Sequence, residues 1–142
     1  MSVAIEVVEE VSDELVAAFG RLLPQLSRSA APLDADRLRA IAGQPGNRLL
    51  MARLDGAVVG TLTLVVFPIP TGLRAWIEDV VVDESARGHG VGAALTREAV
   101  RLARTDGAKT VDLTSRPSRA AANRLYERLG FQLRESKVYR LE

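Results

Sequence analysis

A turn built on Gly88, Gly90 and Gly92 follows Arg87 and opens a stretch of helical periodicity. The first amide groups of a helix have no partner within the helix, and the helix N-terminus carries about half a positive charge. Glycine also lets the backbone come close to a bulky group. The turn is therefore predicted to bind phosphate or pyrophosphate.

A dinucleotide-binding turn is a competing interpretation of the same glycines. Gly88 begins a match to the pattern G-x-G-x-x-G/A, and Asp112 lies near the distance expected for a ribose-binding acid. However, residues 83–87 separate the preceding apolar run from the first glycine, whereas a dinucleotide turn passes almost directly from strand to glycine. Asp112 also falls inside an expected strand rather than at its end. The dinucleotide interpretation is therefore disfavoured.

The chain offers few groups for covalent or metal catalysis. It holds no cysteine and one histidine, His89, which excludes disulfides, thiolate metal sites and multi-histidine clusters. Ser85 and His89 stand four residues apart, but the segment lacks the elbow that exposes a serine nucleophile. We therefore expect no metal, and we expect any group transfer to pass directly from donor to acceptor.

Two adjacent acids, Glu78 and Asp79, interrupt an apolar run. Neighbouring residues of a strand face opposite sides, so only one of them can point into a cleft unless a bulge intervenes. Regular alternation puts Glu78 on the same face as Trp76, Val80 and Val82. A carboxylate there would serve as a general base for an amine if its pKa were raised or a water relayed the proton.

The pattern R-x-x-G-x-G of Arg87, Gly90 and Gly92 resembles the coenzyme A pyrophosphate loop of the GNAT superfamily of N-acetyltransferases. A companion pattern, N-x-x-x-x-x-x-G-F with a tyrosine inside, runs from Asn123 to Phe131. The order of expected helices and strands is similar to that of the family over nearly the whole chain. The resemblance implies an acetyl-CoA-dependent N-acetyltransferase that acts on a primary amine.

The resemblance also implies roles for individual residues. Tyr126 would donate a proton to the leaving thiolate, and Asn123, three residues earlier, would contact the pantetheine arm. A main-chain amide near Val80 or Val82 would polarise the acetyl carbonyl, an interaction worth about 3 to 4 kcal/mol per donor. Glu78 is the preferred base, ahead of its neighbour or a water relay. The candidates are Glu78, Asp79 and Tyr126 for catalysis, and Val80, Val81, Val82, Arg87, Gly88, His89, Gly90, Val91, Gly92, Ala93, Asn123 and Tyr126 for coenzyme binding.

The elements that must position these residues follow from periodicity, caps and turns. Strands are expected at 3–9, 48–54, 57–67, 74–82 and 109–114, with one or two more within 131–141. Helices are expected after the caps Ser12, Asp34, Gly90 and Ser118, ending near Pro24, Gly43, Thr105 and Gly130.

These elements predict the α/β (α+β) fold class, with a mixed, mostly antiparallel sheet and helices on both faces. The strands that flank helix 90–105 are expected to be parallel neighbours, and the resemblance implies a splayed central pair. An Asp55-Gly56 turn joins the second and third strands, and Pro68 and Pro70 are expected to end the third. Residues 1–142 are expected to form one domain.

Charge and hydropathy exclude several partners. The 19 basic and 18 acidic residues give a net charge of +1, which argues against nucleic acid and anionic membranes as partners. No run approaches the roughly 18 apolar residues of a membrane span, and the acidic N-terminus is unlike a signal peptide. The protein is therefore expected to be cytoplasmic.

Some functional questions stay open at this point. A non-catalytic acyl-CoA-binding regulatory domain and a toxin that acetylates aminoacyl-tRNA are alternative functions. The resemblance places the acceptor pocket within residues 24–36, 66–74 and 134–139. These segments contain no pattern that identifies a particular amine. Dimers are common in the family, so a homodimer is also open. The acceptor segments contain Arg28, Asp34, Phe67, Arg74 and Lys137.

Overall fold

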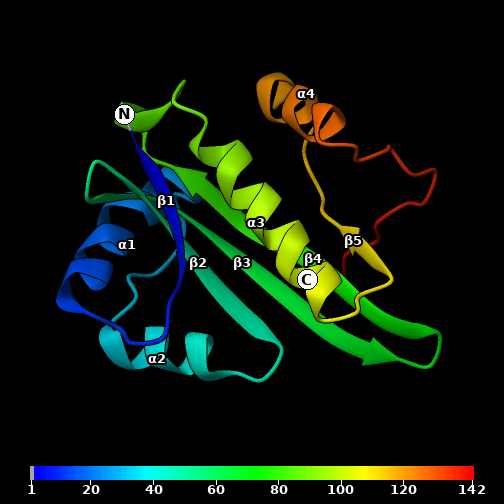
Figure 1. The fold of residues 1–142 in the computed structure, drawn as a ribbon, viewed down its shortest axis with the longest axis horizontal. Helices are drawn as coiled ribbons and strands as arrows, with labels where there is room; N and C mark the ends of the chain where they lie inside the picture. Colours follow the sequence, from blue (N-terminus) through cyan, green and yellow to red (C-terminus); the bar gives the residue numbers. More distant parts are fainter. Residues whose placement is uncertain (1) are drawn as a thin grey trace.

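The computed structural model describes residues 2–142 and has a five-stranded sheet at its centre (Figure 1). In chain order the elements are β1 (Val3–Val7), α1 (Asp13–Leu26), α2 (Ala35–Gly43), β2 (Asn47–Leu54), β3 (Ala57–Ile69), β4 (Gly72–Val82), the short 3₁₀ turn η1 (Glu84–Ala86), α3 (Val91–Thr105), β5 (Thr110–Asp112) and α4 (Ala120–Arg128). The strand order is β1-β2-β3-β4-β5, and only the β4–β5 pair is parallel. The predicted fold class and the parallel pair around α3 are therefore confirmed.

Helices cover both faces of the sheet (Figure 1). α3 packs on one face through Leu95, Ala99 and Leu102, which recur at helical spacing. α1 and α2 cover the other face, where Leu15 and Leu38 are buried in a second cluster. Among the described residues, no helix combines the length and the apolar character that crossing a membrane requires.

Gly60 in β3 has no side chain, which lets α3 come close to the sheet. A Cβ atom at Gly60 would lie 3.1 Å from the Val81 carbonyl oxygen and 3.2 Å from side-chain carbons of Val91 and Leu95. Carbon atoms normally pack about 3.5 to 4.0 Å apart. Gly60 therefore helps to set the position of the first turns of α3.

Several local predictions are confirmed. Ser12 and Asp34 cap α1 and α2, each accepting a hydrogen bond from the backbone N–H three residues on. α1 ends two residues beyond Pro24. Asp55 and Gly56 have φ angles of 50° and 89°, as a two-residue primed turn between β2 and β3 requires.

β3 is longer than predicted. It continues through Pro68 to Ile69, so the prolines do not end it after Phe67. Pro68 pairs with Leu73 next to the turn that leads into β4. A proline is tolerated there because the missing N–H falls at the end of the ladder.

A β-bulge interrupts β4 at the two acids. Thr63 of β3 pairs with Glu78 and Thr61 pairs with Val81, so β4 carries one extra residue over this interval. Asp79 has a positive φ of 51°, which is uncommon for a residue other than glycine. Glu78 and Val81 consequently share a face of the sheet.

The bulge overturns the predicted alternation along β4. Trp76, Glu78, Val80 and Val82 were expected on one face, but the extra residue reverses the order after Glu78. Val80 and Val82 pack against the core under α3, whereas Val81 packs under α1.

The C-terminal part departs furthest from the predicted elements. β5 spans only residues 110–112, whereas a strand was expected at 109–114. The N-cap position of α4 is occupied by Arg119, whereas Ser118 was expected there. Residues 131–142 contain no strand, where one or two were expected. A strand needs a neighbour for its backbone hydrogen bonds, and this segment has no such neighbour in the described part of the chain. Its large apolar residues from position 133 onward are exposed.

Candidate active site

The turn between β4 and α3 presents an open backbone. Gly88 and Gly90 have φ angles of 84° and 77°, in the left-handed region that favours glycine. Nothing lies within 4 Å of where their Cβ atoms would be, and residues 87–90 are exposed. Gly90 caps α3 without a side chain that could accept an amide hydrogen bond. The first N–H groups of α3 therefore have no side-chain partner at the cap and are available to an anion.

Hydrogen bonds shape the segment that leads into this turn. The backbone N–H and the hydroxyl of Ser85 both donate to Asp83, at 3.0 Å, and lower the pKa of its carboxyl. The ring nitrogen Nδ1 of His89 lies 3.0 Å from the carbonyl oxygen of Ala86. Ser85 and His89 therefore have separate partners, and the geometry does not support a nucleophilic pair. Arg87 is exposed beside the glycines.

A gap opens along β4 below the turn. β5 pairs with β4 only from Arg74 to Trp76, although β4 continues to Val82. Over its last six residues, this edge of β4 has no partner strand within residues 2–142. The segment that leaves β5 also holds a polar atom without a partner, the buried hydroxyl oxygen of Ser115. Buried polar atoms normally have a hydrogen-bond partner, so this hydroxyl group could still form a hydrogen bond.

Tyr126 is the buried residue of α4. It is 8% exposed, and its ring packs edge-to-face on Phe131 with the ring centres 6.0 Å apart. Burial raises the pKa of the Tyr126 phenol, and the nearby charge of Arg119 offsets only part of that effect. The phenol therefore stays protonated at neutral pH, as a proton donor must.

Other residues of α4 fix its place beside the turn. The side-chain amide of Asn123 donates to the carbonyl oxygen of Arg116, at 3.1 Å, which ties the preceding segment to the helix. Leu125 packs against Gly92, where a Cβ atom would lie 3.5 Å from its Cδ2 carbon. Gly92 thus links the anion-binding turn to the helix that carries the tyrosine.

A small cavity of about 170 Å³ lies on the other face of β4, under α1 and α2. Both Glu78 and Asp79 line it, together with Thr61 and Thr63. Both acids can reach one cavity because the extra residue of the bulge breaks the strict alternation of faces along β4. The rest of the wall is apolar and consists of Phe19, Leu23, Leu26, Leu33, Leu38, Ile41, Leu49 and Val81.

Only one of the three segments expected around an acceptor contributes to this cavity. Segment 24–36 supplies Leu26 and Leu33, whereas 66–74 and 134–139 supply no lining residue. Segment 134–139 forms no strand that could return to the sheet. The residues singled out earlier, Arg28, Asp34, Phe67, Arg74 and Lys137, all lie outside the lining.

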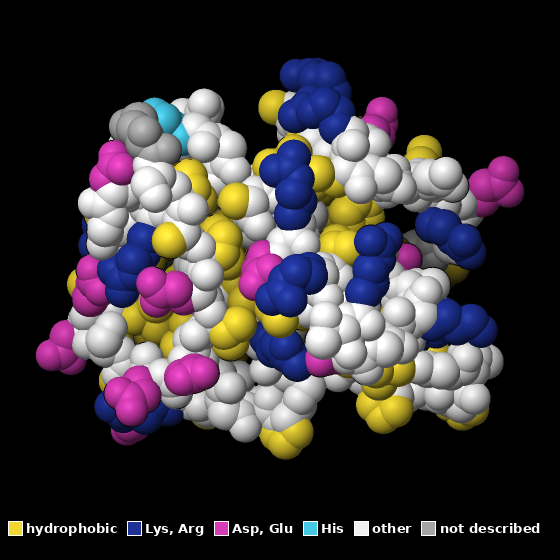
Figure 2. Space-filling view, viewed as in Figure 1, with side chains coloured by type: hydrophobic (Ala, Val, Ile, Leu, Met, Phe, Trp, Pro, Cys, Tyr) yellow, Lys and Arg dark blue, Asp and Glu magenta, His cyan; other side chains and the backbone are white. Residues whose placement is uncertain are grey.

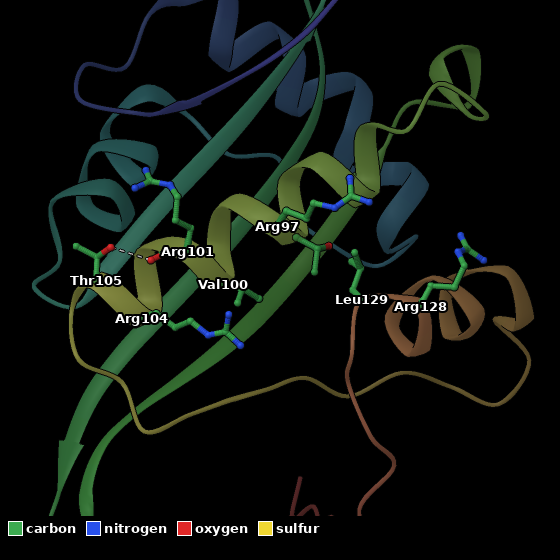
Figure 3. Close-up of a pocket in the computed structure, with 8 residues that line it drawn as sticks. Arg97, Val100, Arg101, Arg104, Thr105, Arg128 and Leu129 are labelled. Atoms are coloured by element: carbon green, nitrogen blue, oxygen red, sulfur yellow. Dashed lines mark hydrogen bonds between the residues drawn. The ribbon is translucent and has the colours of Figure 1, made fainter.

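A second cavity, of about 540 Å³, lies between α3 and the end of α4. Its lining includes Arg97, Arg101 and Arg104 from α3 and Arg128 from α4, with no carboxylate. Figure 3 shows the three arginines of α3 pointing in different directions, so their charges spread along the groove. In Figure 2, basic side chains gather over the α3 and α4 side of this face. The groove can attract anions, but Arg101 is already paired with Glu98, at 2.6 Å, and the arginines do not converge on one point.

The groove lined by these arginines was not predicted from the sequence. A signal was present, because Arg97, Arg101 and Arg104 stand at i, i+4 and i+7, the spacing of one helix face. Within residues 2–142 there is no cluster of three or more side chains that could hold a metal ion.

The glycine turn, the gap and α4 all lie within residues 8–131, which match the model of the acetyltransferase (GNAT) family. The chain belongs to the GNAT acetyltransferase family. Membership makes the protein an N-acetyltransferase, and acetyl-CoA is the cosubstrate of this family.

Individual relatives within the GNAT family agree with this membership. The chain is 40% identical over 117 residues to the glucosamine 6-phosphate N-acetyltransferase of Trypanosoma brucei brucei, covering 77% of this chain and 78% of the relative. It is 33% identical over 108 residues to an L-amino acid N-acetyltransferase of Escherichia coli (strain K12), covering 72% of this chain and 64% of the relative. A solved acetyltransferase structure from Trypanosoma brucei matches with a TM-score of 0.79 at 31% identity, covering 99% of both chains.

Proposed function

We propose that the protein transfers the acetyl group of acetyl-CoA directly to a primary amine, with residues 1–142 acting as one domain. The observation that carries this proposal is the arrangement around β4. An open anion-binding turn follows the strand, a gap runs along its edge, and two carboxylates line a cavity on one face. Donor and acceptor would thus meet across one strand.

We assign coenzyme binding to the turn and to the edge of β4. The backbone of residues 87–93 would hold the pyrophosphate, with His89 contributing through its main chain and Arg87 adding charge. Main-chain groups of residues 80–82 would pair with the pantetheine arm, and one amide would polarise the acetyl carbonyl. One N–H of the Asn123 side-chain amide donates to the carbonyl oxygen of Arg116, so its second N–H and its oxygen would be available to the pantetheine arm.

The chemistry requires one proton to leave the amine and one to reach the sulfur. Acetyl-CoA supplies the acetyl group as a thioester. The amine nitrogen forms a C–N bond to the acetyl carbon, the C–S bond breaks, and its electron pair leaves with the sulfur. Glu78 would take the proton from the amine, directly or through a water, and Tyr126 would give its phenol proton to the sulfur. Asp79 is the second candidate for the base.

The relatives support an amine as the acceptor. Glucosamine 6-phosphate and L-amino acids, the substrates in the relatives' names, each carry a primary amine. An amine in water is mostly an ammonium ion at neutral pH. The carboxylates of Glu78 and Asp79 would attract that ion to the cavity and then accept its proton.

A free-thiol release assay tests this function. The purified protein is mixed with acetyl-CoA and a panel of primary amines, and the N-acetyl product is verified by mass spectrometry. We expect amine-dependent thiol release with equal amounts of coenzyme A and acetylated amine. Acetyl-CoA binding without transfer to any amine, aminoacyl-tRNA included, would contradict the proposal and favour a non-catalytic binding domain.

A further inference from the structure

We infer that the acceptor is a small amine with an apolar body and no anionic group. This inference rests on the proposed function and specifies which amine the cavity under α1 and α2 accepts. It departs from the substrates named for the two curated relatives, since glucosamine 6-phosphate carries a phosphate and an L-amino acid carries a carboxylate.

The size of the cavity limits the acceptor. Its volume of about 170 Å³ is below the roughly 300 to 1,000 Å³ of ordinary ligand pockets. An apolar cavity of about 150 Å³ holds one benzene molecule. The body of the acceptor is therefore expected to be about the size of a branched five-carbon chain or one aromatic ring.

The apolar wall of the cavity favours a hydrocarbon body. Leucines from α1, from the segment before α2 and from β2 line it, with Phe19 and Ile41 between them. Leu38, from α2, is fully buried. A sugar would have to leave hydroxyl groups unpaired against these side chains, which is unfavourable for a buried polar group.

The polar end of the cavity favours a cation. Glu78 and Asp79 are exposed at the point where β4 bulges, and Thr61 and Thr63 add two hydroxyl groups on the neighbouring strand. The lining contains no lysine, arginine or histidine to compensate a phosphate or carboxylate. An anionic acceptor would place its charge near two carboxylates, and like charges repel strongly in a partly enclosed site.

The test compares acceptors that differ in one group. Isopentylamine is leucine without its carboxylate, so this pair measures the effect of the negative charge. Glucosamine and glucosamine 6-phosphate measure the effects of a polar body and of a phosphate. We expect kcat/KM for isopentylamine to exceed that for L-leucine and for glucosamine 6-phosphate by at least about tenfold, the effect of one close charge pair at a protein surface. We expect it to exceed that for glucosamine as well, because the hydroxyl groups of the sugar would be left unpaired against the apolar wall.

A variant tests whether the cavity is responsible for this preference. Thr63→Lys would put a cation into the lining beside Glu78. We expect it to reduce the preference for isopentylamine over L-leucine about tenfold, whereas Thr71→Lys, in the exposed turn between β3 and β4, should leave the preference unchanged. Thermal melting reports whether each variant folds. If Thr63→Lys does not fold, the comparison of amines with the unmodified protein decides alone.

Failure of this inference is distinguishable from failure of the proposed function. Higher kcat/KM for L-leucine or glucosamine 6-phosphate than for isopentylamine would overturn the inference and leave the acetyltransferase function intact. The same amines are also titrated calorimetrically without acetyl-CoA. If no amine is acetylated, the proposed function fails, and tighter binding of isopentylamine than of L-leucine would then support only the selectivity of the cavity for an apolar amine without an anionic group. The opposite order of binding would overturn it.

Discussion

The two faces of the sheet differ in the charge they present and in the part of the chain that presents it. Under α1 and α2, a small apolar cavity ends in the carboxylates of Glu78 and Asp79. On the α3 side, a broad groove carries four arginines, and the glycine turn offers backbone N–H groups. The acidic face suits an ammonium ion, and the basic face suits a coenzyme with phosphate groups. β4 lies between these two charged regions, and in the proposed function it would bring the two ligands together.

This difference predicts how each face responds to substitution. In the proposed function the acidic face acts through two side chains, so replacing them should change catalysis with little effect on coenzyme binding. In the proposed function the glycine turn acts through its backbone N–H groups, so a substitution there should weaken binding only when the new side chain blocks or repels the anion.

Removing the candidate base should have the largest effect on turnover. Glu78→Gln keeps the shape of the side chain but cannot accept the proton, so we expect kcat to fall about 100-fold or more, as for other general bases. Asp79→Asn should lower kcat less. Steady-state kinetics with the best amine measure both, and Glu10→Gln, an exposed acid outside the cavity, is the control.

A larger loss for Asp79→Asn than for Glu78→Gln would exchange the roles of the two acids. Small losses for both variants would show that neither carboxylate is the base.

Placing a negative charge in the glycine turn should weaken coenzyme binding. Gly92→Asp puts a carboxylate in the first turn of α3, where it is favourable for the helix but repels a pyrophosphate. We expect the Kd for acetyl-CoA to rise about 100-fold, the effect of a few kcal/mol of like-charge repulsion. Isothermal titration measures it.

The same exchange on the exposed side of α1, Gly20→Asp, is the control for this prediction. Unchanged acetyl-CoA affinity in Gly92→Asp would exclude the turn as the pyrophosphate site.

Loss of the phenol should have the smallest effect of the three. A thiolate leaves more readily than an alkoxide because a thiol has a pKa near 8.5, so we expect Tyr126→Phe to lower kcat only about tenfold at neutral pH and to leave the Kd for acetyl-CoA unchanged. Tyr139→Phe, which removes an exposed phenol, is the control. Equal kcat for Tyr126→Phe and the unmodified protein would exclude Tyr126 as the acid.

The effects of the Tyr126 phenol on stability and on kcat should both decrease at high pH. Burial raises the pKa of Tyr126 above its ordinary value near 10, so the folded state binds the phenol proton more tightly than the unfolded state. The stabilising effect is complete below pH 10 and is lost as pH rises through the pKa of the folded protein. The ratio of kcat between the unmodified protein and Tyr126→Phe should likewise stay constant to about pH 10 and decline above it.

Much of the fold could be predicted because local signals agree with the final packing. Caps such as Ser12 and the Asp55-Gly56 turn act over a few residues, and the spacing of Leu95 and Leu102 matches one helix face. The parallel pair followed from the length of the connection through α3. These features need no information about distant contacts.

The parts that could not be predicted depend on partners far along the chain. The bulge at Asp79 is visible only once β4 is paired with Thr61 and Thr63, and it decides that both acids reach one cavity. The segment 131–142 has the alternation of a strand, but alternation alone does not supply a neighbouring strand. The roles of the candidate residues in catalysis stay predictions.

The close packing at Gly60 links the middle of the sheet to the proposed coenzyme site at the start of α3. A methyl group there would meet the carbonyl oxygen of Val81 and the side chains of Val91 and Leu95 at once. Relief of those contacts would push α3 outward, together with the amides at its N-terminus. Evolutionary change at a core position that touches no ligand would therefore alter coenzyme affinity as well as stability.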